Sequence, residues 1–239
     1  MKRVAIFVEG ESEKVFIFNL LLKLFDPSEL MIECMKMYTD DNFQEDTNKH
    51  SSPNPKFDFL IINAGSDTKV VSAIYRSSNL MQGYGYTSVI GLRDLYCQDY
   101  HKRSPNVIDQ AVGDKIIKSA QDTINSLGLG TSINLFFSVM EIEAWYFGFS
   151  AALGRLGYTT ANINSILGID LLIIDPEKEF YKPKAELEKI HSRIKSTPFR
   201  EVRFAHAISN EVTLPEINSV IGSSKLSHFK FFFEYLKSL

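Results

Sequence analysis

The acidic residues Glu9, Asp94 and Glu141 each stand where an apolar, strand-like segment of the chain ends. The carboxyl ends of parallel strands meet at one edge of a sheet, and ligands bind at that edge in open sheets. Three carboxylates gathered there would repel one another strongly at low local dielectric. A hard divalent cation with oxygen ligands offsets such repulsion and leaves positions open for water and phosphate oxygens. The positions of these acids therefore predict a Mg²⁺ or Mn²⁺ site suited to phosphoryl-transfer chemistry.

A simpler interpretation is that each acid only stabilises the N-terminus of the helix that follows it, where negative charge is favourable. That interpretation is sufficient for Glu11, Glu13 or Glu143 taken singly. It explains less well why three separate strand ends each carry a carboxylate.

The elements that must position these acids are short apolar runs rich in β-branched residues, separated by amphipathic helical segments. Strands are expected at residues 4–8, 32–38, 57–63, 86–92 and 133–139. Ser12 is a candidate cap for the first helix, and the polar stretch 39–56, with two prolines, is typical of a surface loop. Strands that alternate with helices in this way predict right-handed crossovers. The expected fold class is α/β, with a mostly parallel Rossmann-like sheet flanked by helices.

The pattern changes beyond residue 150, where helical segments dominate. No linker separates this part as an independent domain. We therefore expect an α/β core over residues 1–150 and a helical layer over 151–239 that packs on the same core. The aromatic residues Phe229, Phe232 and Phe233 are too closely spaced for a solvated helix and are expected to be buried.

Composition narrows the classes of protein to consider. The chain has 239 residues and a formal net charge of −3, so no global positive field indicates nucleic-acid binding. Its two cysteines, Cys34 and Cys97, are not in a CxxC pair and suit a reducing cytoplasm. The histidines lack HExxH or HxxxH spacing, and no Walker-type phosphate loop is present. No apolar stretch is long enough to cross a bilayer, so we expect a cytoplasmic protein with no membrane partner.

Basic residues in the C-terminal part are a second candidate for binding phosphate. They are Lys182, Lys184, Lys189, Arg193, Lys195, Arg200 and Arg203. Together they could hold a phosphate backbone. Helix faces of mixed charge are usually only solvated, and Glu186 and Glu188 lie within this segment.

Three motifs resemble the Toprim-like family. Residues 8–13, Val-Glu-Gly-Glu-Ser-Glu, look like the family's first strand end, where a catalytic glutamate precedes glycine. Residues 91–96, Gly-Leu-Arg-Asp-Leu-Tyr, fall where the family carries an aspartate at a strand end. Residues 140–147, Met-Glu-Ile-Glu-Ala-Trp-Tyr-Phe, resemble the glutamate-rich helix start of the DUF4276 branch, which is related to the nuclease domains of OLD-type proteins.

The resemblance implies Mg²⁺- or Mn²⁺-dependent cleavage of nucleic-acid phosphodiesters, with DNA favoured over RNA, in an anti-phage or mobile-element defence system. Carried over by motif, Glu9 is a general base or metal ligand and Asp94 is a metal ligand. Glu141 or Glu143 is a further ligand, and Glu13 could help to hold a second ion. The catalytic set would be Glu9, Asp94 and Glu141.

The chain departs from the family at Tyr96, where the common Asp-x-Asp pattern has its second aspartate. This departure favours one ion over two. It also keeps open a non-catalytic Toprim-fold subunit that binds a partner ATPase in a defence complex. Whichever class applies, a homo-oligomer of the chain is also possible. A small phosphatase or nucleotide-binding protein on the same scaffold is a third class.

Overall fold

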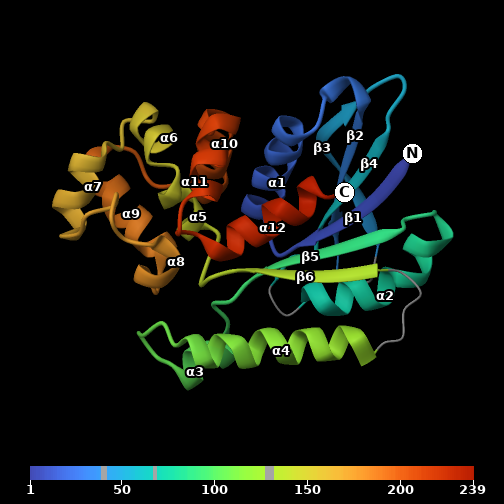
Figure 1. The fold of residues 1–239 in the computed structure, drawn as a ribbon, viewed down its shortest axis with the longest axis horizontal. Coiled ribbons are helices and arrows are strands. Elements are labelled where there is room, and N and C mark those ends of the chain that lie inside the picture. Colours follow the sequence, from blue (N-terminus) through green and yellow to red (C-terminus); the bar gives the residue numbers. More distant parts are fainter. Residues whose placement is uncertain (39–41, 67–68, 127–131) are drawn as a thin grey trace. The chain divides into compact units, whose positions relative to one another are not determined.

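The computed structural model describes residues 1–38, 42–66, 69–126 and 132–239 (Figure 1). Its sheet has the order β3-β2-β4-β1-β5-β6. The strands are β1 (Lys2–Val8), β2 (Leu30–Met37), β3 (Phe43–Ser51), β4 (Phe57–Asn63), β5 (Ser88–Asp94) and β6 (Ser132–Ser138). β1 is parallel to β4 and β5, and β2 is parallel to β4, whereas β3 is antiparallel to β2. The expected α/β class with a mostly parallel sheet is confirmed.

β1 is a central strand because its sequence can be buried on both faces. Its residues from Val4 to Val8 are all fully buried. Such a continuous apolar run is typical of a parallel strand covered by helices on both sides. The register places Val8 opposite Asn63 of β4 and opposite Leu92 of β5. β1, β4 and β5 therefore run toward the same edge of the sheet.

The two long crossovers near the N-terminus leave the sheet in opposite directions. α1 (Glu11–Leu24) connects β1 to β2, and α2 (Lys69–Gly83) connects β4 to β5. Right-handed crossovers in opposite directions place their helices on opposite faces of the sheet, as α1 and α2 are in Figure 1. The carboxyl ends of β1 and β4 therefore form a topological switch point, the usual place for a ligand in such a fold.

The expectation of a surface loop over residues 39–56 is wrong for most of that stretch. β3 occupies Phe43–Ser51 and pairs with β2 from Met37↔Phe43 to Met31↔Ser51. Its residues are either partly or largely exposed, and none is buried, so the strand carries no buried apolar face. Backbone bonds to β2 hold this edge strand, and charged residues are common on such edges. Residues 39–41 of the stretch lie outside the described residues.

Ser12 is not the cap that the sequence suggested for the first helix. α1 begins at Glu11, and its N-cap is Gly10, whose backbone is extended and forms no side-chain cap bond. Ser12 is therefore inside the first turn, where it is fully buried.

Internal contacts divide the chain into two compact units. The first unit comprises residues 1–93 and 114–137, and the second comprises 94–113 and 138–239. α4 (Gln110–Ser126) begins in the second unit and continues in the first. The division does not fall at residue 150, because residues 138–150 belong with the C-terminal helices.

The second unit is mostly helical. Its helices are α3 (Gln98–Arg103), α5 (Glu143–Gly148), α6 (Ser150–Arg155), α7 (Thr160–Leu167), α8 (Pro176–Glu179), α9 (Pro183–Ile194), α10 (Glu201–Glu211), α11 (Leu214–Gly222) and α12 (Ser227–Lys237). In the part of the chain that the structure describes, no helix is long and apolar enough to cross a bilayer.

The expected burial of the C-terminal aromatic residues is confirmed. Phe229, Phe232 and Phe233 of α12 are all buried. The ring of Trp145 in α5 lies with its centroid 5.1 Å from that of Phe229 and 5.8 Å from that of Phe232. Buried Glu177 of α8 accepts hydrogen bonds from Trp145 Nε1 at 3.0 Å and from the Phe229 amide at 3.1 Å. One carboxylate thus holds α12 and α5 together.

Candidate functional site

A polar side chain of β4, Asn63, lies at the switch point of the first unit and connects it to α1. Asn63 Nδ2 donates to Glu11 Oε2 at 3.2 Å, and Asn63 Oδ1 accepts from the Gly65 amide at 2.9 Å. The Ala64 amide donates to the Val8 carbonyl at 2.9 Å, which continues the pairing of β1 and β4 past their last residues. Asn63 therefore orients the start of α1 relative to the end of β4.

Lys14 is a buried cation beside this point. Its ammonium pairs with Glu11 at 2.6 Å and with Asp46 of β3, and its side chain has no exposed surface. Burial by itself would lower the pKa of Lys14, but hydrogen bonds to Asp46 and Glu11 outweigh burial and raise it. Glu11 is thus neutralised within the protein and is a poor candidate for holding a metal ion.

Two predicted site residues of the first unit are close to the N-terminus of α1. Glu9 is the residue after β1 and is partly exposed. Glu13 is buried in the first turn of α1, and a Cβ at Gly10 would lie 3.0 Å from its Oε2. The carboxylate of Glu13 thus bends back over the start of its own helix, a favourable place for negative charge. This placement supports the simpler, structural interpretation of Glu13.

Beyond the ends of β2 and β4, the first unit has a cavity of about 190 Å³. Its lining includes the cationic residues Lys69 and Arg76 of α2 and the hydroxyl of Ser72. Cations and hydroxyls bind anions such as phosphate. The sequence analysis did not single out these residues, because their spacing matches no phosphate-binding motif.

In the second unit, Asp94 is held by a neighbouring strand end. Ser138, the last residue of β6, donates its hydroxyl to Asp94 Oδ1. The Leu95 amide donates to the Ser138 carbonyl at 2.9 Å, so the backbones are tied together at the same place. Asp94 is 9 % exposed and Ser138 is fully buried. A serine at the end of an apolar strand gave no signal in the sequence.

Glu141 follows Met140, whose backbone conformation is unusual for a residue other than glycine. Met140 has a φ of 64°, in the left-handed region that side chains other than glycine rarely adopt. The turn brings Glu141 Oε2 to 3.1 Å from the amide of Lys184, in the first turn of α9. Burial raises the pKa of Glu141, although the bond from Lys184 acts in the opposite direction. Perturbed carboxyl groups of this kind gather at functional sites.

The side chain of Lys184 lies among carboxylates. Its ammonium forms an ion pair with Glu201, the first residue of α10. Burial would lower the pKa of Lys184, but Glu201, Glu143 and Glu141 outweigh burial and raise it. Glu143 itself is 3 % exposed at the start of α5. The ammonium thus contacts Glu201 and interacts electrostatically with Glu143 and Glu141, so this group has more carboxylates than ammonium groups.

Tyr96 is part of an aromatic cluster. The centroid of its ring lies 5.5 Å from that of Tyr181 and 6.2 Å from that of His101. Tyr181 donates its hydroxyl to the Ser104 carbonyl at 2.9 Å, so the hydroxyl accepts from His101 Nδ1 at 3.1 Å. A tyrosine packed against rings, rather than a second carboxylate, therefore occupies the position where the resemblance would place an aspartate.

The structure brings the predicted residues together only in part. Glu9 and Glu13 belong to the first unit, and Asp94, Glu141 and Glu143 belong to the second. Within the described ranges, no three Asp, Glu, His or Cys side chains are grouped so that they could hold a metal ion. The metal site of Glu9, Glu13, Asp94, Glu141 and Glu143 therefore stays a prediction.

Two residues that organise the site were missed as such from sequence. The sequence analysis did not place Lys184 at the acidic site, and Glu201 was not considered. A signal for Lys184 was present, because Pro183 precedes it and proline favours the first helical position. The proline predicts a helix start, but not which carboxylate that start meets.

Comparisons with known proteins leave the family open. No family model matches the chain, and no curated protein matches its sequence. Among solved structures, it is similar to a protein from Lactobacillus plantarum described as a "putative cell surface hydrolase". That similarity has a TM-score of 0.35 at 10% identity, and it covers 100% of this chain and 90% of the other. A similarity of this size carries no argument about function.

Proposed function

We propose that the chain is a Mg²⁺-dependent nuclease that hydrolyses nucleic-acid phosphodiesters, in a defence system against phage or mobile elements. The observation that carries the proposal is the Glu141 group. The buried carboxyl of Glu141 has a raised pKa and interacts with Lys184, as do Glu143 and Glu201. The group has more carboxylates than ammonium groups, and this favours a divalent cation. The defence role rests on the resemblance of the motifs alone.

The residues present fit Mg²⁺ in their chemistry. Mg²⁺ prefers hard oxygen ligands and commonly uses only one or two carboxylates, with water and substrate phosphates completing its shell. Asp94 and Glu141 would hold the ion, together with Glu9. When bound, the ion would polarise a phosphate oxygen and lower the pKa of a bound water.

Side chains of the protein have the remaining tasks. Ser138 keeps the Asp94 carboxylate in one orientation by donating to Oδ1. The Lys184 amide does the same for Glu141 Oε2 by donating to it at 3.1 Å. Glu9, which is partly exposed, would accept a proton from the attacking water.

Substitutions that keep shape but remove charge test the proposal. Asp94→Asn, Glu141→Gln and Glu9→Gln should each lower Mg²⁺- or Mn²⁺-dependent cleavage of plasmid and single-stranded DNA by about 100-fold or more. Asp122→Asn, which alters an exposed ion pair on α4, is the matched control and should leave cleavage unchanged. A wild-type protein that cleaves no DNA or RNA with either metal, and binds neither metal in calorimetry, would overturn the proposal.

A second candidate function is a non-catalytic subunit that binds a partner ATPase. The observation that favours it is the packing of Tyr96 against Tyr181, since no carboxylate stands at that position. On this alternative, the wild-type protein is inactive alone, and Asp94→Asn still forms the complex with the ATPase. Cleavage by the isolated chain would rule it out.

A further inference from the structure

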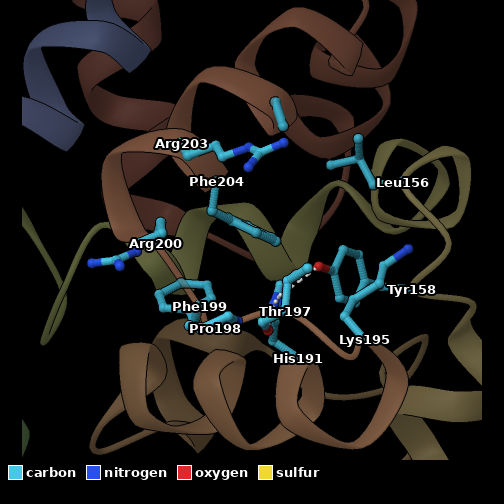
Figure 2. A pocket seen from close by; sticks show the side chains of 11 residues that line it. Leu156, Tyr158, His191, Lys195, Thr197, Pro198, Phe199, Arg200, Arg203 and Phe204 are labelled. Atoms are coloured by element: carbon cyan, nitrogen blue, oxygen red, sulfur yellow. Dashed lines mark hydrogen bonds between the residues drawn. The ribbon is translucent and has the colours of Figure 1, made fainter.

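The second unit contains an aromatic pocket that the proposed reaction does not use. It has a volume of about 170 Å³ and lies between α9, α10 and the segment after α6 (Figure 2). Its lining residues are Leu156, Tyr158, His191, Lys195, Thr197, Pro198, Phe199, Arg200, Arg203, Phe204 and Ala207. The pocket thus combines ring surfaces with cationic side chains.

Four rings form a closed circuit around the pocket. Ring centroids are 5.5 Å apart for Tyr158 and Phe204, and 5.5 Å apart for Phe204 and Phe199. They are 5.4 Å apart for Phe199 and His191, and 6.0 Å apart for His191 and Tyr158. Each ring is supported by its two neighbours, so the walls are held in position before any ligand binds.

Hydrogen bonds fix the polar wall of the pocket. His191 Nε2 lies 2.8 Å from the Thr197 carbonyl, which can only accept, so Nε2 carries a proton. In the neutral ring, Nδ1 then accepts from the Tyr158 hydroxyl at 2.7 Å. Burial raises the pKa of Tyr158, which keeps the phenol protonated for this bond. The two rings are therefore locked in one orientation.

The border of the pocket is positively charged. Lys195 Nζ lies 5.2 Å from the centroid of the Tyr158 ring, and Figure 2 shows Lys195 and Arg203 on different sides of the Phe204 ring. Among the described residues, neither Lys195 nor Arg203 forms an ion pair with a carboxylate. The nearby Glu201 is paired with Lys184 instead. An anionic group of a ligand would supply the charge that is missing here.

We propose that this pocket binds a nucleobase with its attached phosphate, as a single-stranded nucleic acid presents them. The base packs against Tyr158, Phe199 and Phe204, and the phosphate lies on Lys195 and Arg203. Aromatic surfaces beside a cationic track are the usual means of binding unpaired strands. The volume is below that of pockets that enclose whole drug-sized ligands, so one ring system enters and the phosphate stays at the border.

The choice of a nucleic acid over other aromatic anions rests on the proposed function. α9 links the two places, because Lys184 in its first turn belongs to the Glu141 group and His191 lines the pocket. Lys184 and His191 are seven positions apart in the helix, which is about 10 Å along its axis. A strand held at the pocket by one base would therefore pass near the proposed site of cleavage.

The test measures binding with metal chelated, so that it is independent of cleavage. A labelled oligothymidylate is titrated with protein in EDTA and followed by fluorescence anisotropy, with thymidine monophosphate as competitor. Phe199→Leu, which keeps an apolar side chain but removes the ring, should weaken oligonucleotide binding about tenfold. Lys195→Ala should also weaken binding and reduce the salt dependence by about one phosphate contact. Lys230→Ala, which removes an exposed cation of α12 outside the pocket lining, should change binding little.

Each outcome bears on the inference. If thymidine monophosphate displaces the oligonucleotide from the wild-type protein but not from Phe199→Leu, one base and its phosphate are enough for binding, as proposed. Thymidine monophosphate that binds where the oligonucleotide does not would identify a free nucleotide as the ligand and overturn the nucleic-acid assignment. Absence of any binding, or equal effects of Phe199→Leu and Lys230→Ala, would overturn the proposed binding pocket. A protein that binds but never cleaves would contradict the proposed function alone.

Discussion

Glu141 and Lys14 show two ways in which this protein holds a buried charge. Lys14 meets Glu11 and Asp46 at its ammonium, and these bonds favour the charged form. Glu141 accepts one backbone bond from Lys184, which only partly offsets the effect of burial, so the pKa of Glu141 stays raised. The charge of Lys14 is balanced by carboxylates of the protein, whereas an added cation would stabilise the charged form of Glu141. This contrast is why Glu141 is the better candidate for function.

The raised pKa of Glu141 has a consequence for stability. The folded state binds this proton more tightly than the unfolded chain, whose carboxyl has the ordinary value of 4.5. Stability therefore falls as the pH rises from about 4.5 through the folded pKa, and the loss persists at neutral pH. Glu141→Gln keeps the acceptor for the Lys184 amide but removes the charge. In EDTA at neutral pH its melting temperature should equal or exceed that of the wild type.

The difference in melting temperature between Glu141→Gln and the wild type should shrink as the pH falls below about 4.5. Thermal unfolding followed by circular dichroism across this pH range measures it. Glu179→Gln, which changes an exposed residue of α8, is the control and should show no such trend. The assignment would be contradicted if the melting temperature of Glu141→Gln, relative to that of the wild type, were lower at neutral pH than at acid pH.

Gly91 shows how closely an element of the first unit is packed. A Cβ at this position of β5 would lie 2.5 Å from Leu135 Cδ2 of β6 and 2.9 Å from Ile74 Cδ1 of α2. The absence of a side chain lets α2 approach the sheet. The sequence shows Gly91 only as part of a motif before Asp94, with no indication of this role.

Gly91→Ala should therefore lower the free energy of unfolding by about 1–3 kcal/mol, because the added methyl overpacks the interface between helix and sheet. Urea unfolding followed by circular dichroism measures the change. Gly83→Ala at the end of α2 adds a methyl with no atom within 4 Å, and it should be neutral or stabilising by up to about 1 kcal/mol. Equal effects of the two substitutions would show that packing at Gly91 is not as described.

The chain passes between the two compact units at residues 93–94, 113–114 and 137–138. A cut at residue 150 would therefore remove most of the second unit and leave α5 behind. Its residues Trp145, Tyr146 and Phe147 are almost fully buried and would lose the helices that cover them.

A fragment of residues 1–150 should accordingly aggregate or bind hydrophobic dyes, because large exposed apolar patches are unstable in water. Size-exclusion chromatography and dye fluorescence test this, with the full chain as the control. A monomeric fragment with one cooperative melting transition would show that residues 1–150 fold without the C-terminal helices, which would contradict this prediction.

The strands and the acids at their ends could be predicted from sequence, because both are local features. A run such as residues 4–8 is apolar enough to require a central position, and Glu9 follows it by covalent connection. β3 could not be predicted, because backbone pairing with β2 holds it rather than an apolar face. Strand order likewise depends on which edge each crossover reaches.

The partners of the charged side chains were decided by the tertiary structure alone. Lys14 meets Asp46, and Glu141 meets Lys184, which lies 43 residues further along the chain. The aromatic pocket joins Tyr158 to Phe204 in the same way. Many pairings of opposite charges or of rings differ little in free energy when considered in isolation. Packing of the whole chain selects among them, and no local pattern in the sequence carries that information.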